Sequence, residues 1–431
     1  MISIEQLYDL FEQHPVITTD SRDCPAGSIF FALKGETFNG NQYAKQALDK
    51  GCAYAVVDEI AKEDEDDKRM FLVDNVLLTL QQLAQFHRRR LGTTVIGITG
   101  TNGKTTTKEL IAAVLKRKYN ILYTQGNFNN SIGVPKTVLQ LRPEHELAVI
   151  EMGASHPGDI NELVNIAEPD YGIITNVGRA HLLGFGSFEG VVRTKGELYD
   201  FIRQHGGTVF INAADTNLMG IADGLRLIKY ADDGNFISSD PFLRFKWNGH
   251  EVQTQLIGAY NINNALAAAM IGHNFGVPDD DICQALSEYT PSNNRSQFVQ
   301  TATNRLIVDA YNANPTSMMA SLRNFSDMKA TNKLAILGDM RELGEVSQDE
   351  HCSIIRFLAS QGIEAWLVGG EFAKAADSLS TSDIAGYASS VRCFADAEAI
   401  KHYIADNQPA DRTILVKGSN GTRLFTLPEI L

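Results

Sequence analysis

The sequence predicts an α/β protein built from three domains, which we place at residues 1–89, 90–293 and 294–431. Its 431 residues exceed what one ordinary hydrophobic core organises, so two or three domains are expected. From about residue 93 the chain alternates strand, loop and helix, and this alternation restarts after the turn-rich stretch 291–296 (PSNNRS). Repeated alternation of this kind is typical of mostly parallel sheets covered by helices.

The composition limits the class of protein. Apolar residues make up 44% of the chain and charged residues 21%, as in soluble globular proteins. The formal net charge of −14 argues against a nucleic-acid backbone as the main partner, although local Lys and Arg side chains can still bind small anions. The N-terminus is acidic and amphipathic, and no apolar run approaches the roughly 20 residues that span a bilayer. We therefore expect a cytoplasmic protein without a signal sequence and without membrane insertion.

The cysteines indicate reduced thiols. They are odd in number, scattered along the chain and without a C-x-x-C pair: Cys24, Cys52, Cys283, Cys352 and Cys393. This pattern favours a reducing compartment over a disulfide framework or a zinc site.

The first segment mixes short strands and helices up to about residue 88. Two strands and two helices are expected in it, at 28–35 and 54–59 and at 41–51 and 81–92 respectively. Gly51 closes the first of these helices, since glycine is favoured just after the last helical turn. The acidic run 63–67 (EDEDD) indicates a solvated loop rather than a metal site.

The second and third segments supply the strands of the parallel sheets. A strand at 93–100 leads into a helix at 105–119, and further apolar strands are expected at 146–153, 171–178 and 208–215. Four more strand candidates follow in the third segment, at 305–315, 333–340, 364–370 and 412–419. In this fold class ligands bind beyond the carboxyl ends of the strands, so the residues that follow each strand are the candidates for function.

Residues 95–107 read VIGITGTNGKTTT, which is a strand, a glycine-rich turn and the start of a helix. Backbone N–H groups and a helix N-terminus directed at one point bind anions. Lys104 would neutralise nucleotide β- and γ-phosphates, and the Thr105 hydroxyl would bind Mg²⁺. The generic P-loop pattern requires its first glycine where this chain has Ile98, so an ordinary strand-to-helix turn is the alternative interpretation.

Three polar residues in the second segment are candidates for metal binding or catalysis. Glu151 ends an apolar strand, where a carboxylate needs a partner such as Mg²⁺ beside nucleotide phosphates; a salt-bridged core glutamate is the alternative. His181 and Lys195 are not specific by themselves. A structural histidine and a solvated helix lysine paired with Glu189 or Glu197 explain them equally.

Asn261 and Asn264 lie three residues apart near the start of an alanine-rich helix over 258–272. That spacing places both amides on one side, where they could hydrogen-bond a nucleotide base or phosphate. Helix capping is the alternative, since asparagine is a favoured N-cap residue.

Taken together, these stretches resemble the Mur ligase family, the ATP-dependent amide-forming enzymes of peptidoglycan assembly. The family's phosphate loop reads TGTNGKT, as residues 99–105 do here, and the resemblance runs in order over nearly the whole chain. It implies a small α/β N-terminal domain for a UDP-linked substrate, a central P-loop ATPase domain with a mostly parallel sheet, and a Rossmann-like α/β C-terminal domain.

Within the family, three stretches favour the members that join D-alanyl-D-alanine to UDP-N-acetylmuramoyl-tripeptide through an acyl phosphate. These are 124–139 (TQGNFNNSIGVPKTVL), 307–318 (IVDAYNANPTSM) and 335–344 (AILGDMRELG). One alternative is the member that adds a diamino acid to UDP-N-acetylmuramoyl-dipeptide, which usually carries an Asp-Asn-Pro-Arg-like motif that we do not find. A P-loop nucleotide-binding protein without ligase chemistry is the other.

The resemblance also implies roles for single residues. ATP would be bound by Gly100, Thr101, Asn102, Gly103, Lys104, Thr105, Thr106, Asn261, Asn264, Arg295 and Asp309. Two Mg²⁺ sites would involve Thr105, Glu151, His181 and Lys195, the last as a carbamylated lysine. Lys104, Lys195 and His181 would be catalytic. The UDP group would contact Ser21 and Arg22, and the two peptide substrates would contact Asn127, Asn130, Tyr311, Asn312 and Asn314.

Two departures from the family pattern stand out. Tyr260 occupies a position that is often His, and 38–44 (FNGNQYA) replaces a more usual Asp-Gly-His-like sequence. We further expect a monomer that closes around its substrates, with hinges near 88–92 and 291–296, because three domains must align the reacting groups and exclude water.

Overall fold

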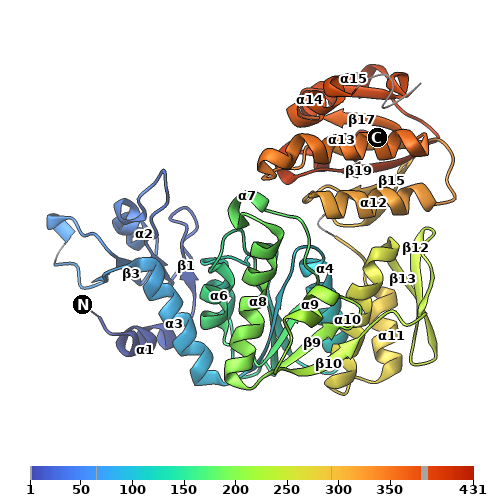
Figure 1. Cartoon of the computed structure of the whole chain (residues 1–431). Coiled ribbons are helices and arrows are strands. Elements are labelled where there is room, and N and C mark those ends of the chain that lie inside the picture. The colour runs from blue at the N-terminus through green and yellow to red at the C-terminus, as the bar shows by residue number, and fades with distance from the viewer. Residues whose placement is uncertain (1, 65, 293, 380–386) are drawn as a thin grey trace.

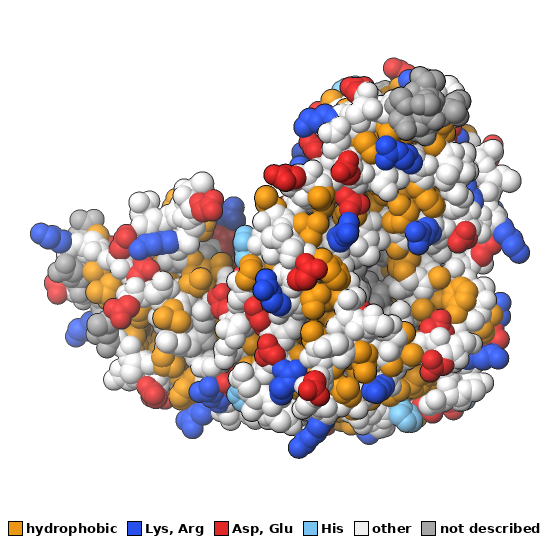
Figure 2. All heavy atoms as spheres, in the orientation of Figure 1, with side chains coloured by type: hydrophobic (Ala, Val, Ile, Leu, Met, Phe, Trp, Pro, Cys, Tyr) orange, Lys and Arg blue, Asp and Glu red, His pale blue; other side chains and the backbone are white. Residues whose placement is uncertain are grey.

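The computed structural model describes residues 2–64, 66–292, 294–379 and 387–431, which form three bodies. In Figure 1 the N-terminal body lies to the left of the central body and the C-terminal body lies above it. Each body has its own mainly parallel sheet with helices packed on it, so the predicted fold class of three α/β domains is confirmed. Within the described ranges, no helix is both long enough and apolar enough to cross a membrane. Figure 2 shows acidic and basic side chains interspersed over one face of the molecule.

The N-terminal body holds a four-stranded parallel sheet in the order β1-β2-β3-β4. Its elements are β1 (Ile17–Thr18), β2 (Ile29–Phe31), β3 (Tyr54–Val57), β4 (Met70–Leu72), α1 (Ile4–Gln13), α2 (Ala44–Asp49) and α3 (Val76–Leu91). The strand expected at 28–35 is shorter than predicted, and a 3₁₀ turn over Gly40–Tyr43 replaces the first part of the helix expected at 41–51. α3 starts five residues earlier than predicted because the Asn75 side chain caps it by accepting from Leu78 N.

A six-stranded, fully parallel sheet forms the central body, in the order β10-β9-β8-β5-β7-β6. The strands are β5 (Thr94–Thr99), β6 (Ile121–Tyr123), β7 (Leu147–Glu151), β8 (Tyr171–Ile174), β9 (Thr208–Asn212) and β10 (Arg226–Tyr230). One face is covered by α4 (Lys104–Leu115), α10 (Ile262–Asn274) and α11 (Asp279–Glu288). The other is covered by α5 (Gly133–Val138), α6 (Asp159–Ala167) and α8 (Phe188–His205). Because β7 and β8 flank β5, the loops after these three strands meet at one edge.

The end of α3 is tied to the central body. Arg88 is buried; its Nε donates to Ala167 O at 3.1 Å, and its guanidinium pairs with Asp170 at 2.9 Å. α3 also packs against α5 and α6. Gly92 ends the helix with a φ of +67°, a conformation that glycine adopts without strain, and β5 begins two residues later.

A three-stranded antiparallel sheet, which the sequence analysis did not predict, follows the central sheet. It consists of β11 (Phe236–Ser238), β12 (Phe242–Trp247) and β13 (His250–Ile257). Asn248 and Gly249, both with positive φ, make the two-residue turn between β12 and β13. Buried and exposed residues alternate along β13, as expected for a strand with one face on a core, and that face packs against α11.

The C-terminal body holds a second six-stranded sheet, in the order β14-β15-β19-β16-β17-β18, in which only β14 is antiparallel to its neighbour. The strands are β14 (Gln297–Gln300), β15 (Arg305–Asp309), β16 (Lys333–Gly338), β17 (Glu364–Val368), β18 (Val391–Phe394) and β19 (Thr413–Lys417). The helices include α12 (Pro315–Asp327), α13 (Ser347–Gln361), α14 (Gly370–Ser378) and α15 (Ala397–Asp406). Separate hydrophobic clusters fill the two faces of the sheet.

The strand expected at 305–315 ends at Asp309, because Asn314 and Pro315 start α12 instead. The Asn314 side chain accepts from Ser317 N in a capping box, and Pro315 occupies the first helical position. Two predicted features fall partly outside the described residues: the expected hinge 291–296 contains Asn293, and the acidic run 63–67 contains Glu65.

Candidate active site

A cleft of about 630 Å³ lies at the carboxyl ends of β5, β7 and β8 and extends to the C-terminal body. Most of the residues that the sequence singled out line this cleft: Thr101, Asn102, Gly103, Lys104, Thr105, Thr106, Asn127, Asn130, Glu151, His181, Asn261, Asn264, Arg295, Asp309, Tyr311 and Asn312. The cleft therefore brings together side chains that are more than 200 residues apart in the sequence.

The phosphate loop is closely packed. Gly100 has a φ of +142°, and a Cβ atom there would lie 2.0 Å from Thr175 Oγ1; a Cβ at Gly103 would lie 2.7 Å from Asn264 Oδ1. Both positions therefore require glycine. The ammonium of Lys104 is folded back over the loop, donating to Gly100 O at 2.6 Å and Thr101 O at 3.2 Å.

The pKa of the Lys104 ammonium is set by burial and by two neighbouring charges. Its burial lowers the pKa to about 8; the Glu151 carboxylate raises that pKa, and the Arg295 guanidinium lowers it. The bound phosphate of a nucleotide would supply the negative charge that favours the protonated form. The loop and its lysine thus form a candidate anion site at the N-terminus of α4.

Glu151 ends β7 and is only 1% exposed. Its Oε1 accepts from Thr105 Oγ1 at 3.1 Å and from Asn129 Nδ2 at 2.8 Å. Its Oε2 has no hydrogen-bond partner in the described part of the chain and lies 3.7 Å from Lys108 Nζ. A hydroxyl hydrogen-bonded to a buried carboxylate is a donor set that fits Mg²⁺, which also takes oxygens from phosphate and water. The salt-bridge alternative for Glu151 is realised as well, by Lys108.

The remaining metal candidates do not form a complete cage. Among the residues that the structure describes, no group of three or more His, Cys, Asp and Glu side chains is arranged to hold a metal. His181 lines the cleft, but its Nδ1 pairs with the Glu342 carboxylate of the C-terminal body. Any ion held here would depend on oxygens from the substrates.

Lys195 on α8 is buried, with 2% of its surface exposed, which contradicts the interpretation as a solvated helix lysine. Its Nζ donates to Ala154 O at 3.4 Å and lies 5.3 Å from the centre of the Phe185 ring. Burial, and then the charge of Lys104, hold the pKa of Lys195 well below its ordinary value. Lys195 thus reaches the wall of the cleft at Ala154, which lines it.

Asn261 and Asn264 link α10 to the phosphate loop rather than capping their helix. Asn264 Nδ2 donates to Asn261 Oδ1 at 2.8 Å, and Asn264 Oδ1 accepts from Thr107 Oγ1 on α4 at 3.1 Å. The neighbouring Tyr260 donates to or accepts from Ser296 Oγ at 3.0 Å, and burial raises the pKa of its hydroxyl. Asn261 does occupy the N-cap position of α10, but its side chain makes no capping hydrogen bond.

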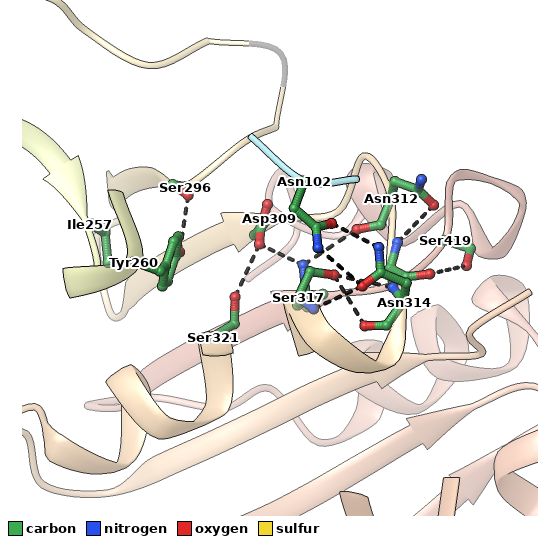
Figure 3. A network of polar contacts seen from close by, with 12 residues as sticks. Asn102, Ile257, Tyr260, Ser296, Asp309, Asn312, Asn314, Ser317, Ser321 and Ser419 are labelled. Carbon is green, nitrogen blue, oxygen red and sulfur yellow. Dashed lines mark hydrogen bonds and ion pairs between the residues drawn. The ribbon is translucent and has the colours of Figure 1, made fainter. Parts of the chain in front are cut away.

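The C-terminal body contributes an ion pair to the cleft, between the buried Lys417 and the half-buried Asp309. Asp309 Oδ2 accepts from Lys417 Nζ at 2.6 Å. It also accepts from Ser321 Oγ at 3.1 Å (Figure 3). The Arg295 guanidinium lies 3.8 Å from the centre of the Tyr311 ring, which is stacking distance.

Asn314 lies between the bodies. It caps α12, donates from Nδ2 to Asn102 Oδ1 at 2.7 Å and accepts from Asn102 Nδ2 at 3.5 Å (Figure 3). The phosphate loop is thus hydrogen-bonded directly to the first turn of a helix in another domain.

Two predicted substrate residues lie away from this cleft. Ser21 and Arg22 follow β1 in the N-terminal body; Arg22 pairs with Asp20 at 2.7 Å, and Ser21 O accepts from Lys50 Nζ. In the stretch 38–44, Asn39 and Asn41 hydrogen-bond to carboxylates rather than projecting freely. The assignment of this region to a uridine group stays a prediction.

A second cavity, of about 680 Å³, lies at the carboxyl ends of β16, β17 and β18. Arg341, Glu342 and Arg423 line it, and Leu183 of α7 (Leu182–Phe185) reaches it from the central body. Because Glu342 pairs with His181, this residue pair stands between the two cavities. The stretch 335–344 was singled out in the sequence only through the family resemblance.

Four functional candidates were missed by sequence reasoning. Asn176 bonds to both the N–H and the C=O of Asn102; Asn129 and Lys108 contact Glu151; and Lys417 pairs with Asp309. Asn176 and Lys417 lie near the carboxyl ends of predicted strands. Because ligands bind at that edge of a parallel sheet, the sequence could have indicated both residues.

Comparisons with known proteins match this architecture. Three family models cover the chain: Mur ligase family, catalytic domain (15–88), Mur ligase middle domain (98–272), and Mur ligase, glutamate ligase domain (294–420). The UDP-N-acetylmuramoyl-tripeptide–D-alanyl-D-alanine ligase of Escherichia coli (strain K12) is 34% identical over 429 residues, which cover 95% of this chain and 91% of that protein. The Bacillus subtilis (strain 168) protein of the same name is 35% identical, covering 78% and 75%.

Solved structures agree. A crystal structure of MurF from Acinetobacter baumannii superposes with a TM-score of 0.84 at 32% identity, covering 96% of this chain and 92% of that one. MurF ligase from Thermotoga maritima in complex with ADP gives a TM-score of 0.84 at 25% identity, covering 98% and 97%.

Proposed function

The chain belongs to the Mur ligase family, and we propose that it joins D-alanyl-D-alanine to UDP-N-acetylmuramoyl-tripeptide at the expense of ATP. It is an ATP-dependent amide-bond-forming ligase of peptidoglycan synthesis. The observation that carries this proposal is the cleft of about 630 Å³, in which a phosphate loop, a buried carboxylate and an ion pair from another domain meet. The Escherichia coli ligase with this activity in its name aligns over more than nine-tenths of both chains.

The reaction proceeds in two steps. The tripeptide carboxylate attacks the γ-phosphorus of ATP, which forms an acyl phosphate and releases ADP. The amine of the dipeptide then attacks the acyl carbon, and phosphate leaves with the oxygen that the carboxylate supplied, while the nitrogen loses a proton. Activation is needed because an oxide ion is not a workable leaving group, whereas phosphate is.

The first step brings two anions together, so cationic side chains and a magnesium ion are needed. Lys104 would bind the β- and γ-phosphates once nucleotide displaces its ammonium from the loop carbonyls. Thr105 and Glu151 would hold Mg²⁺, which neutralises phosphate charge when bound. Arg295 lines the same cleft and adds positive charge near the transferred group.

We propose that Lys195 is carbamylated. A neutral lysine amine adds to the carbon of CO₂, forming an N–C bond and losing one proton, and the pKa of Lys195 favours that neutral form. The resulting carbamate is an anion, which the Lys104 ammonium would attract, whereas the same ammonium disfavours a protonated Lys195. His181 would add an imidazole ligand for a metal ion on this side of the cleft once it is free of Glu342.

The second cavity suits the dipeptide, which carries an ammonium at one end and a carboxylate at the other. Arg341 is exposed to the cavity and can bind a carboxylate, and acidic side chains such as Glu342 and Asp396 can bind an ammonium. We expect Arg341→Ala to raise KM for the dipeptide about tenfold or more and to leave KM for ATP unchanged. Arg392→Ala, an exposed arginine outside the cavity, is the matched control.

A cytoplasmic monomer is the form in which we propose that the reaction takes place. All five cysteines are free thiols, which suits a reducing compartment.

The deciding experiment measures phosphate release from ATP with defined substrate pairs. The proposal expects release with UDP-N-acetylmuramoyl-tripeptide and D-alanyl-D-alanine together, and a pentapeptide product by mass spectrometry. Release that requires UDP-N-acetylmuramoyl-dipeptide and a diamino acid would support the other ligase. Slow hydrolysis that ignores both amines would support a nucleotide-binding protein without ligase chemistry.

A further inference from the structure

α4 carries a second lysine one helical turn after Lys104, and this one is fully buried. The Lys108 side chain is 0% exposed, and its Nζ lies 3.7 Å from Glu151 Oε2 and 3.1 Å from Glu109 Oε1. Lys108 Nζ and Glu151 Oε2 are both without a hydrogen bond in the described part of the chain. Because desolvating an ammonium is costly, a fully buried lysine requires a compensating charge and merits a functional explanation.

The helix places Lys108 and Thr105 on the same carboxylate. Residues three apart share a helix face, so α4 directs the Thr105 hydroxyl to Oε1 and the Lys108 ammonium to Oε2 of Glu151. Asn129, in the loop between β6 and α5, also donates to Oε1. The carboxylate is therefore held by three groups, each at a defined oxygen.

Glu109 is the other acid near Lys108, but it does not need this lysine. Its side chain is 21% exposed and can be solvated, whereas that of Glu151 is 1% exposed. Lys108 is the one cation that forms an ion pair with Glu151 within 4 Å among the described residues. Glu151 lines the cleft and Lys108 lies behind it, so Lys108 acts from the side away from the substrates.

We propose that Lys108 is a positioning residue for the carboxylate that would bind Mg²⁺. It fixes Glu151 Oε2 at the rear of the cleft, so that Oε1 stays beside the Thr105 hydroxyl, where a divalent ion would bind both. This inference rests on the proposed function, since it takes Glu151 as a metal ligand. Groups that orient a ligand in this way are worth about 10–100-fold in metal affinity.

The test measures Mn²⁺ binding in the presence of ADP by electron paramagnetic resonance, on the full chain. Lys108→Met removes the charge and keeps the length, and we expect Kd for Mn²⁺ to rise about tenfold or more. Lys108→Arg restores the cation and is expected to bind within about threefold of the unmodified protein. Lys116→Met is the matched control, because Lys116 lies at the exposed end of the same helix, and it should leave Kd unchanged.

The same Kd in Lys108→Met as in the unmodified protein would overturn the proposal, and so would a lower Kd, which would mean that Lys108 opposes the metal. If Lys108→Met does not fold, as judged by circular dichroism, Lys108→Gln replaces it with the same expectation. Glu109→Gln should not change Kd; a rise equal to that of Lys108→Met would assign the effect to the Glu109 pair and refute the proposal. Glu151→Gln separates the two claims: unchanged Mn²⁺ binding there would refute the metal site itself.

Discussion

The hydrogen bonds between Asn102 and Asn314 predict an energetic coupling between the phosphate loop and the C-terminal domain. Asn314 Nδ2 donates to Asn102 Oδ1 at 2.7 Å, and the return contact is 3.5 Å. The perturbation is Asn314→Ser combined with Asn102→Ala. Serine keeps an N-cap oxygen for Ser317 N, so α12 retains its cap while the longer amide that reaches Asn102 is lost.

The magnitude follows from the geometry. A hydrogen bond at 2.7 Å between neutral groups contributes about 1 kcal/mol net, and one at 3.5 Å adds little. About 1 kcal/mol corresponds to about a fivefold change in kcat/KM at 25 °C. Each single substitution removes the same bond, so the double variant should lose about fivefold less than the product of the two single losses.

The assay is phosphate release under substrate-limiting ATP for the unmodified protein, both single variants and the double variant. A double-mutant cycle isolates the pairwise contribution because Asn102 also contacts Asn176 and lines the cleft. Single losses that multiply to the double loss would show that the two residues act independently. That result would refute the view that this contact aligns the domains during catalysis.

Three further outcomes are expected. Lys195→Ala should be nearly inactive and should be partly rescued by a short carboxylic acid such as acetate. Normal activity of the unmodified protein in CO₂-free buffer would contradict the carbamate. Glu151→Gln should raise the Mg²⁺ concentration that gives half-maximal phosphate release, and an unchanged titration would make Glu151 a purely structural residue. Burial lowers the pKa of Lys104 to about 8, and lysine is cationic below its pKa, so kcat/KM for ATP should fall as pH rises through about 8. Lys104→Arg should shift that fall to higher pH, whereas a flat profile from pH 7 to 9.5 in the unmodified protein would contradict the assignment.

Much of the site could be predicted because its residues follow apolar strands of parallel sheets. Lys104 follows the loop after β5, Glu151 is the last residue of β7, and β15 ends at Asp309. All parallel strands end at the same edge, so a residue just after each strand is placed there whatever the strand order. The roles of these residues toward ATP and metal stay predictions.

Contacts that depend on strand order were not predictable in the same way. Lys417 pairs with Asp309 because β19 is inserted between β15 and β16, which aligns these two residues in register. Nothing in the sequence around 413–417 indicates that this strand pairs with β15. Lys108 likewise follows three threonines in a polar stretch typical of an exposed helix start, and only the packing of α4 on β7 buries it.

One signal was present but not used. Asn-Gly between FLRFKW and HEVQTQLI is a strong two-residue hairpin signal, and it correctly indicates β12 and β13. The edge strand β18 has no comparable signal. Its residues are exposed or half-exposed and do not alternate between buried and exposed, as residues of a strand packed on a core do.

The contact between the central and C-terminal bodies divides into two sides with different chemistry. On the side of β12 and β13 it is apolar: Ile257 packs among Ile307 and Ala313, and the rings of Phe242 and Phe298 lie 5.6 Å apart.

On the cleft side the contact is polar, through Asn102–Asn314, Arg179–Glu350 and His181–Glu342. Hydrogen bonds and ion pairs are exchanged for bonds to water at a net cost of about 1 kcal/mol or less each, whereas separating apolar surfaces is opposed in proportion to the area exposed. A rotation of the C-terminal body that keeps the apolar side in contact therefore opens the cleft more easily than a motion that pulls the apolar surfaces apart. Substrates that bind to both bodies on the polar side would favour closure, because their charged groups would add contacts to the hydrogen bonds and ion pairs already there.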